Sequence, residues 1–274
     1  MTVAADAVFG GLAVSDFRPS EKDAPVIVLL SSLGVSRRSW AGVGPILGRE
    51  YRCLAVDIPG HGGSEPAKNF MTIEDFAEAV AAMLDRAGIR DAILVGNSMG
   101  ATIATELAVT RPDLVSQLVH VGSAVWDSEE GRRQWLHSRS SLFCRPDGTL
   151  FDMTEDFVVN IFGAYDAAHH LMLKEDQAAA GPRLASAMWA IYAYDTLIAL
   201  GRLSQPVLAV FGENDPYRTQ TLPLLRQTVA RLDEVVIPGG GHLLPVDRAT
   251  ELAACILAWL RDERGARITK DCLD

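Results

Sequence analysis

The sequence predicts an α/β fold, in which a mostly parallel sheet is flanked by helices. Short apolar runs alternate along the chain with amphipathic stretches, as expected when each strand is followed by a helix. The runs are continuously apolar, which is typical of strands that are buried on both faces. With 274 residues, of which 49% are hydrophobic and 22% charged, the chain is large enough for one domain with a sizeable insertion.

The strands and the clearest helix can be placed from these patterns. The helix is expected over 73–87, where apolar residues recur at helical spacing. Thr72 and Asp75 resemble a capping arrangement at its start, and Gly88 lies where it should end. Six apolar runs are the predicted strands: 25–30, 52–57, 92–96, 118–122, 207–212 and 234–237.

The alternation of strands and helices breaks between residues 123 and 200. This segment is rich in aromatic residues and holds no run like the predicted strands. We therefore expect a helical cap insertion over 123–200, above a core made of 1–122 and 201–274. Beyond it, Asp247 is the expected cap of a last helix that runs through the apolar stretch 252–260.

Charge and composition exclude several classes of partner. The net charge of −10 would repel a polyanion, so no nucleic-acid partner is expected. The N-terminus shows no secretory signal, and the longest apolar run, 252–260, is far shorter than the ~20 residues of a membrane span. Cys53 and Cys255 lie in apolar segments and are expected in the core. We expect a cytoplasmic protein without a membrane partner; the sequence does not indicate its oligomeric state.

A nucleophile motif directly follows the predicted strand 92–96. Residues Gly96-Asn97-Ser98-Met99-Gly100 form a G-x-S-x-G sequence, and helix-forming residues come next. A sharp turn from strand to helix strains the backbone at the serine, and the flanking glycines let neighbouring chains approach. The hydroxyl is then exposed at a helix start, where negative charge is favoured. Ser98 is the predicted nucleophile; the alternative is an ordinary turn flanked by glycines.

A serine hydroxyl needs a base to take its proton, and the best-placed histidine is His242. It follows Pro238-Gly239-Gly240-Gly241, between the predicted strand 234–237 and the last helix. The glycines allow a bend that can bring the imidazole over the sheet edge. The other five histidines are expected at surface or packing positions: His61, His120, His137, His169 and His170.

The base in turn needs a carboxylate that fixes its tautomer. Asp215 is the best candidate, because Gly212-Glu213-Asn214-Asp215-Pro216 ends the strand 207–212. An acid after the preceding strand, Asp127 or Glu129, is the competing choice. The preferred set gives the chain order Ser98, Asp215, His242.

Backbone N–H groups should bind the negative charge that develops on a carbonyl oxygen. We expect one from Met99 and the other from Leu33, in the loop Ser31-Ser32-Leu33-Gly34. Pockets are largely apolar and aromatic, and the candidate pocket residues are Ser32, Asn97, Trp126, Trp189 and Leu243. Four arginines either bind a substrate carboxylate or are solvated: Arg132, Arg133, Arg139 and Arg145.

These motifs together resemble the α/β-hydrolase fold family over nearly the whole chain. Residues 57–64, Asp-Ile-Pro-Gly-His-Gly-Gly-Ser, are similar to the family's loop after the fourth strand. Residues 32–34 with 38–40 are similar to the oxyanion loop of 3-oxoadipate enol-lactonases, and 96–100 to the elbow of meta-cleavage product hydrolases. The latter carry an H-G-G-G-P loop that is absent here, and an aromatic residue where this chain has Leu243. The family's usual His-Gly pair is replaced by Ser31-Ser32.

The resemblance implies a capped serine hydrolase, and the predicted function is hydrolysis of a small carboxylic ester or lactone through an acyl-enzyme on Ser98. A carbon–carbon bond hydrolase, a cofactor-free oxygenase with a His–Asp pair and a non-catalytic ligand receptor are the alternatives. A serine at the elbow argues against dehalogenase or epoxide hydrolase chemistry. The sequence has no phosphate loop and no H-E-x-x-H motif, so neither a metal nor an organic cofactor is expected.

Overall fold

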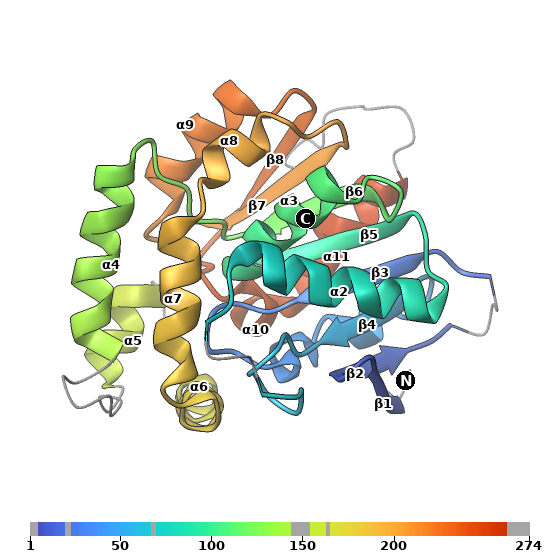
Figure 1. Cartoon of the computed structure of the whole chain (residues 1–274), viewed down its shortest axis with the longest axis horizontal. Helices are drawn as coiled ribbons and strands as arrows, with labels where there is room; N and C mark the ends of the chain where they lie inside the picture. Colours follow the sequence, from blue (N-terminus) through green and yellow to red (C-terminus); the bar gives the residue numbers. More distant parts are fainter. Residues whose placement is uncertain (1–4, 20–22, 67–69, 144–153, 163–164, 262–274) are drawn as a thin grey trace.

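The computed structural model describes residues 5–19, 23–66, 70–143, 154–162 and 165–261. One eight-stranded sheet, in the order β1-β2-β4-β3-β5-β6-β7-β8, runs through the molecule (Figure 1). From β4 to β8 in this order all neighbours pair in parallel, which confirms the predicted α/β class. The strands are β1 (Ala5–Phe9), β2 (Leu12–Phe17), β3 (Val26–Leu30), β4 (Arg52–Val56), β5 (Ala92–Asn97), β6 (Val115–Val121), β7 (Val207–Gly212) and β8 (Leu232–Ile237).

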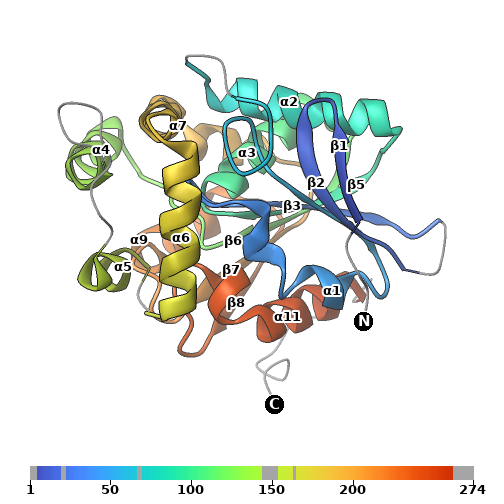
Figure 2. The ribbon, with the colours of Figure 1, turned by 90° about the horizontal axis from the view of Figure 1, so that it is seen from below.

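Helices cover both faces of the sheet, which explains why the strands are continuously apolar. In β3, Val28 and Leu30 belong to the core beneath α2 and α3, whereas Ile27 and Leu29 belong to the core beneath α1 and α11. Figure 2 shows these two helical layers on opposite sides of the sheet. The helices outside the segment between β6 and β7 are η1 (Arg37–Trp40), α1 (Gly44–Leu47), α2 (Ile73–Ala87), α3 (Met99–Thr110), α9 (Arg218–Thr228), α10 (Leu244–Asp247) and α11 (Ala249–Arg261).

Helix α2 begins and ends where the sequence indicates. The hydroxyl of Thr72 accepts from the N–H of Asp75 at 3.2 Å, and the carboxylate of Asp75 accepts from the N–H of Thr72 at 2.8 Å. Gly88 ends the helix in the left-handed conformation, with φ of 66°. The predicted cap of the last helix is wrong, because Asp247 ends α10 and α11 begins at Ala249.

The N-terminal hairpin of β1 and β2 is absent from the sequence-based prediction. The two strands are antiparallel and are joined by Gly10 and Gly11, which both have positive φ. They lie at the edge of the sheet, where Val8 is 69% exposed. An edge hairpin of this kind lacks the continuous apolar run that marks the buried strands.

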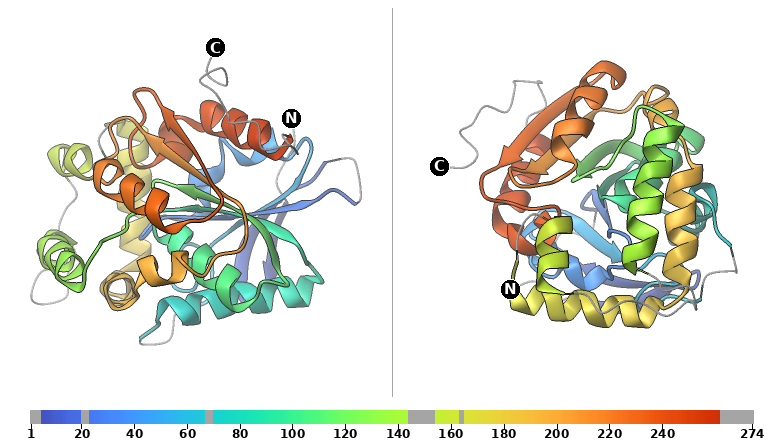
Figure 3. Two further views of the ribbon diagram at one scale, coloured as in Figure 1. Left: turned by 90° about the horizontal axis from the view of Figure 1, so that it is seen from above. Right: turned by 90° about the vertical axis from the view of Figure 1, so that its left-hand side faces the viewer.

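The described residues between β6 and β7 form helices, which we call the inserted helices: α4 (Glu129–Phe143), α5 (Glu155–Phe162), α6 (Ala167–Ala180), α7 (Arg183–Ala193) and α8 (Thr196–Leu200). Figure 3 (right) shows α4, α6 and α7 across one end of the molecule. The N–H of Ser36, in the loop after β3, donates to Asp176 of α6. Leu243, in the loop after β8, packs with Val158 of α5 and Leu173 of α6. The inserted helices therefore pack on loops at the carboxyl ends of the strands. Among the described residues, no helix has the length and apolar character needed to cross a bilayer.

Candidate active site

Ser98 occupies a strained turn between β5 and α3. Its φ of 52° and ψ of −113° lie in a region that side-chain-bearing residues rarely adopt. Its N–H donates to the carbonyl of Val121 at the end of β6, at 2.9 Å. Ser98 is half-buried, whereas its neighbours Asn97 and Met99 are buried. Of these three residues, the turn therefore leaves only Ser98 partly exposed.

The geometry explains the two glycines of the motif. A Cβ at Gly96 would lie 2.3 Å from the backbone of Gly100, and a Cβ at Gly100 would lie 2.3 Å from the carbonyl oxygen of Leu30. Both distances are far shorter than any van der Waals contact, so only glycine fits. The second contact also packs the start of α3 against the end of β3, where the Leu33 loop begins.

His242 and Asp215 form a buried pair at the ends of β8 and β7. His242 Nδ1 lies 3.0 Å from Asp215 Oδ2, and the two residues are only 3% and 4% exposed. The other carboxylate oxygen accepts from the N–H of Tyr217 at 2.8 Å. A carboxylate only accepts, so the proton lies on Nδ1 and the lone pair on Nε2, the tautomer that a general base requires. The competing acid Asp127 is exposed and bonds to Ser128 instead.

The side chain of Asn97 connects the loop of His242 to the serine turn. The side-chain amide of Asn97 donates to the carbonyls of Val121 and His242, at 3.0 Å each. Gly122 has φ of 54°, and a Cβ there would lie 2.9 Å from Asp215 Oδ2 and 3.1 Å from His242 Nδ1. Asn97, a candidate pocket residue, is buried and engaged with these two carbonyls. The structure thus brings the predicted nucleophile, base and acid loops together.

Asp247 also bonds to the loop of His242. Its Oδ2 accepts from the N–H of Gly241 at 2.7 Å, directly before His242. The acid and base loops also touch, since a Cβ at Gly212 would lie 2.2 Å from the carbonyl oxygen of Gly240. Glycine is therefore required where these two loops cross.

Three consecutive amides of the loop after β3 have acceptors within the protein. The N–H of Gly34 donates to His61 Nε2 at 3.1 Å, that of Val35 to the carbonyl of Ser32 at 3.1 Å, and that of Ser36 to Asp176 Oδ2 at 2.8 Å. Within the described part of the chain, the N–H of Leu33 donates to no protein acceptor. Met99 is the first residue of α3, so its N–H has no acceptor within the helix. Among the described residues, the N–H groups of Leu33 and Met99 therefore have no acceptor within the protein.

Serine hydroxyls close the loop after β3, where Ser31-Ser32 stands in place of the family's usual His-Gly pair. The hydroxyls of Ser31 and Ser39 each lie 3.0 Å from the carbonyl oxygen of Ser36, and 3.1 Å from one another. Ser32 is buried, and its carbonyl accepts from Val35. The candidate pocket residue Ser32 thus takes part in the turn that follows β3.

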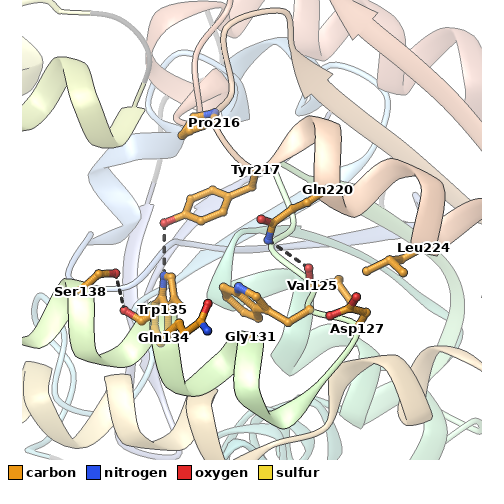
Figure 4. Close-up of a pocket in the computed structure, with 11 residues that line it drawn as sticks. Val125, Asp127, Gly131, Gln134, Trp135, Ser138, Pro216, Tyr217, Gln220 and Leu224 are labelled. Carbon is orange, nitrogen blue, oxygen red and sulfur yellow. Dashed lines mark hydrogen bonds between the residues drawn. The ribbon is translucent and has the colours of Figure 1, made fainter.

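Tyr217 lies in the wall of a cavity of about 700 Å³ (Figure 4). The Tyr217 ring centroid is 5.0 Å from that of His242, and the Tyr217 hydroxyl accepts from Trp135 Nε1 at 3.3 Å. Trp126 lines the same cavity and packs on Trp135 with ring centroids 5.0 Å apart. Asp127 and Gln134 supply polar groups to its wall.

A second cavity, of about 240 Å³, lies beside the base loop. Leu243, the residue after His242, forms part of its wall, together with Leu173 and His169 of α6 and Arg248. Leu243, a candidate pocket residue, thus lines this cavity. Trp189, by contrast, is 55% exposed, packs edge-on against Tyr192 and is absent from the described linings of both cavities.

Arg132 and Arg133, two of the four candidate arginines, are engaged within the protein. Arg132 Nε donates to the carbonyl of Tyr192 at 3.1 Å, and its Nη1 lies 3.1 Å from Asp195. Arg133 pairs with Glu130 one helical turn away. Arg145 and the side chain of Arg139 lie outside the described residues. Among the described residues, no group of three or more His, Cys, Asp or Glu could hold a metal ion.

Several residues of the site escape prediction from the sequence. The bond from the N–H of Tyr217 to Asp215 is the exception. An aspartate side chain often accepts from the N–H two residues on, in an Asx turn, so this bond could have been predicted. Gly122 ends a predicted strand, but nothing in the sequence indicates its contact with Asp215. His61 lies in the motif 57–64, but nothing in that motif indicates its bond to Gly34, and Asp176 has no local signal.

Comparison with known proteins gives the same fold. A family model described as alpha/beta hydrolase fold matches residues 25–249. The magnesium-chelatase 30 kDa subunit of Rhodobacter capsulatus is 29% identical over 265 residues, covering 87% of each chain. The pimeloyl-[acyl-carrier protein] methyl ester esterase of Nitrosomonas europaea is 26% identical over 228 residues, covering 80% of this chain and 88% of that protein. The solved enol-lactonase from Burkholderia xenovorans LB400 is similar with a TM-score of 0.72 at 23% identity, covering 93% of this chain and 99% of the other.

Proposed function

This chain belongs to the alpha/beta hydrolase fold family, and from that membership we propose that it is a serine hydrolase that cleaves a small carboxylic ester or a lactone. One observation carries the proposal. Ser98 lies in a strained turn whose preceding residue, Asn97, bonds to the backbone of His242, while His242 pairs with buried Asp215. A positioned nucleophile, base and orienting acid are what acyl transfer requires.

In the acylation step, Ser98 Oγ attacks the carbonyl carbon of the substrate while His242 Nε2 accepts the hydroxyl proton. Asp215 stabilises the imidazolium that forms and keeps Nδ1 protonated. The negative charge on the carbonyl oxygen is bound by the N–H groups of Leu33 and Met99. The tetrahedral intermediate then collapses, and His242 gives its proton to the leaving alkoxide.

In the deacylation step, a water molecule loses a proton to His242 Nε2 and attacks the acyl-enzyme. The same two N–H groups bind the second oxyanion, and collapse restores the Ser98 hydroxyl and releases the carboxylic acid. With a lactone the leaving alkoxide stays attached to the acyl group, so the single product is a hydroxy acid.

Two kinds of support favour an ester or lactone as substrate. The esterase of Nitrosomonas europaea and the enol-lactonase of Burkholderia xenovorans carry such activities in their names. The cavities near His242 combine apolar and aromatic side chains, such as Trp126, Trp135 and Leu243, with polar and charged ones, such as Asp127 and Arg248. The apolar and aromatic side chains can pack on the uncharged acyl part of a small ester, and the polar ones can bind its oxygens.

The test is a panel of small esters, lactones and dienoates assayed with wild type, Ser98→Ala and Ser116→Ala. Ser116 lies at the opposite end of the sheet, where its hydroxyl donates to the carbonyl of Asp91, so its variant is the matched control. We expect ester or lactone turnover that falls by a factor of about 10⁴ or more in Ser98→Ala and stays within about twofold in Ser116→Ala.

Other outcomes point to the alternatives. Turnover of a dienoate without esterase activity would replace the proposal by carbon–carbon hydrolysis. Oxygen consumption that continues in Ser98→Ala would indicate a cofactor-free oxygenase. Ester hydrolysis that persists in Ser98→Ala would overturn the serine mechanism itself.

A further inference from the structure

His61 bonds to the loop that carries Leu33. It lies in the loop after β4, is 3% exposed, and its Nε2 accepts from the N–H of Gly34 at 3.1 Å. Its Nδ1 lies 3.3 Å from the carbonyl oxygen of Pro59. Neither contact belongs to the proposed triad.

We propose that His61 is a positioning residue of the oxyanion hole, which sets the conformation of residues 33–36 and so keeps the N–H of Leu33 aimed at the reacting carbonyl oxygen. This inference rests on the proposed serine hydrolase function. It adds to that function a group that touches neither the substrate nor the reacting atoms.

The hydrogen bonds fix the tautomer of His61. An amide N–H only donates, so Nε2 must carry the lone pair, and Nδ1 then carries the proton and donates to Pro59. His61 is therefore a neutral acceptor, and burial lowers its pKa and so favours this neutral form. Any replacement without an acceptor at the Nε2 position leaves the buried N–H of Gly34 unpaired, which costs free energy unless the loop moves.

The loop has little freedom to rearrange without consequence for Leu33. Gly34 has φ of 70°, and a Cβ there would lie 2.9 Å from Leu184 and 3.3 Å from Gln177 of the inserted helices. Asp176, the neighbour of Gln177 in α6, also accepts from the N–H of Ser36. A loop that shifts to find a new acceptor for Gly34 therefore moves the adjacent amide of Leu33 as well.

Three substitutions of His61 distinguish the effect of its contact with Gly34 from that of its contact with Pro59. Gln places a carbonyl oxygen near the Nε2 position and keeps the acceptor for Gly34. Asn reaches only to the Nδ1 position, so it keeps a donor to Pro59 but has no acceptor for Gly34. Leu keeps the bulk of the side chain and has neither group, so Asn is the second test where Leu prevents folding.

The readout is the inhibition constant of a trifluoromethyl ketone built on the best ester substrate, measured together with kcat and KM. Ser98 Oγ adds to the ketone carbon, His242 takes the serine proton, and the resulting oxyanion occupies the same hole as the reaction intermediate. Protein that has unfolded irreversibly lowers the measured kcat but does not change the inhibition constant of the chains that stay folded, so a loss of folded protein alone leaves this constant unchanged.

We expect His61→Leu and His61→Asn to raise this inhibition constant by about 10- to 100-fold and to lower kcat by a similar factor, with KM within about threefold. His61→Gln should recover most of the loss. His120→Leu is the matched control, because His120 is also buried but bonds to Thr105 of α3; its inhibition constant should stay within about threefold of wild type.

An inhibition constant in His61→Asn equal to that of wild type would overturn the positioning role and leave the serine mechanism intact. An equal rise in His120→Leu would also overturn it, since the effect would then not depend on Gly34. A wild-type protein that hydrolyses no ester and binds no trifluoromethyl ketone would overturn the proposed function, and this role with it.

Discussion

The carboxyl ends of β5, β7 and β8 and the inserted helices α4–α8 are built in different ways. At the strand ends, crossing backbones leave no room for a Cβ at Gly96, Gly100 or Gly212. The inserted helices are held instead by side-chain contacts, such as Tyr194 to Glu106 of α3 at 2.5 Å and Arg132 to Asp195. The strand ends therefore hold the loops of the reacting groups in part by close backbone crossings, whereas the inserted helices are attached through side chains.

This difference suggests a division of labour. The strand ends present Ser98, Asp215 and His242, which the proposed reaction needs for any substrate. The inserted helices supply walls such as Trp135 and Leu173 to the cavities beside His242. Substitutions at the strand ends should then lower kcat for every substrate, and those in the inserted helices should shift KM for some substrates.

The largest effect is expected from Asp215→Asn. An amide can donate to His242 Nδ1 and favours the tautomer that cannot accept the proton of Ser98, so kcat should fall by about 10³- to 10⁴-fold. Steady-state kinetics on the best ester check this. Asp127→Asn, in the segment before α4, is the control and should keep kcat within about threefold of wild type; the reverse pattern would make Asp127 the acid.

Gly122→Ala tests whether backbone crowding fixes the His–Asp pair. The new methyl would lie 2.9 Å from Asp215 Oδ2, so we expect kcat to fall by about 10- to 100-fold. Gly88→Ala is matched to it, because Gly88 also has positive φ but nothing lies within 4 Å of its Cβ position. Both variants should lose about 1 kcal/mol of stability, and only Gly122→Ala should lose activity.

Trp135→Phe addresses the inserted helices. It removes the hydrogen bond to the Tyr217 hydroxyl and changes the wall of the larger cavity. We expect KM to change by about two- to tenfold in a manner that depends on the acyl group, with kcat within about threefold. Trp189→Phe, at an exposed position of α7, should match wild type across the ester panel. A uniform loss of kcat in Trp135→Phe would contradict the division of labour.

The smallest effect concerns stability. His120 is buried in β6 beneath α3, and burial lowers its pKa to about 4 from 6.5. Between these values the unfolded chain binds a proton that the folded chain does not, so the free energy of unfolding should fall by about 1–3 kcal/mol as the pH drops from 6.5 to 4. Urea unfolding across this range measures it. The slope should flatten in His120→Gln and persist in His169→Gln, whose site on α6 is partly exposed.

The sheet could be predicted because its strands are buried on both faces, and so stand out as continuous apolar runs such as 207–212. The edge hairpin of β1 and β2 could not, because one of its faces is open to solvent. The loops of Ser98, Asp215 and His242 could be located because glycines that the backbone crossings require lie beside each of them.

Contacts between distant segments could not be predicted. His61 bonds to Gly34 over 27 residues and Asp176 to Ser36 over 140 residues, and both are contacts of a side chain with a backbone amide. An amide is present at almost every position, so the sequence does not indicate which one a histidine or an aspartate will accept from. The lining of the cavities escapes prediction for the same reason, as the exposed position of Trp189 illustrates.

The most direct test of the account is covalent labelling with a fluorophosphonate, followed by peptide mass spectrometry and measurement of the labelling rate. Activation of Ser98 by His242 predicts one phosphonyl group per chain, on the peptide that contains Ser98, and a rate at least about 100-fold lower in His242→Gln. A wild-type chain that stays unlabelled, or a His242→Gln chain that is labelled as fast as wild type, would contradict it.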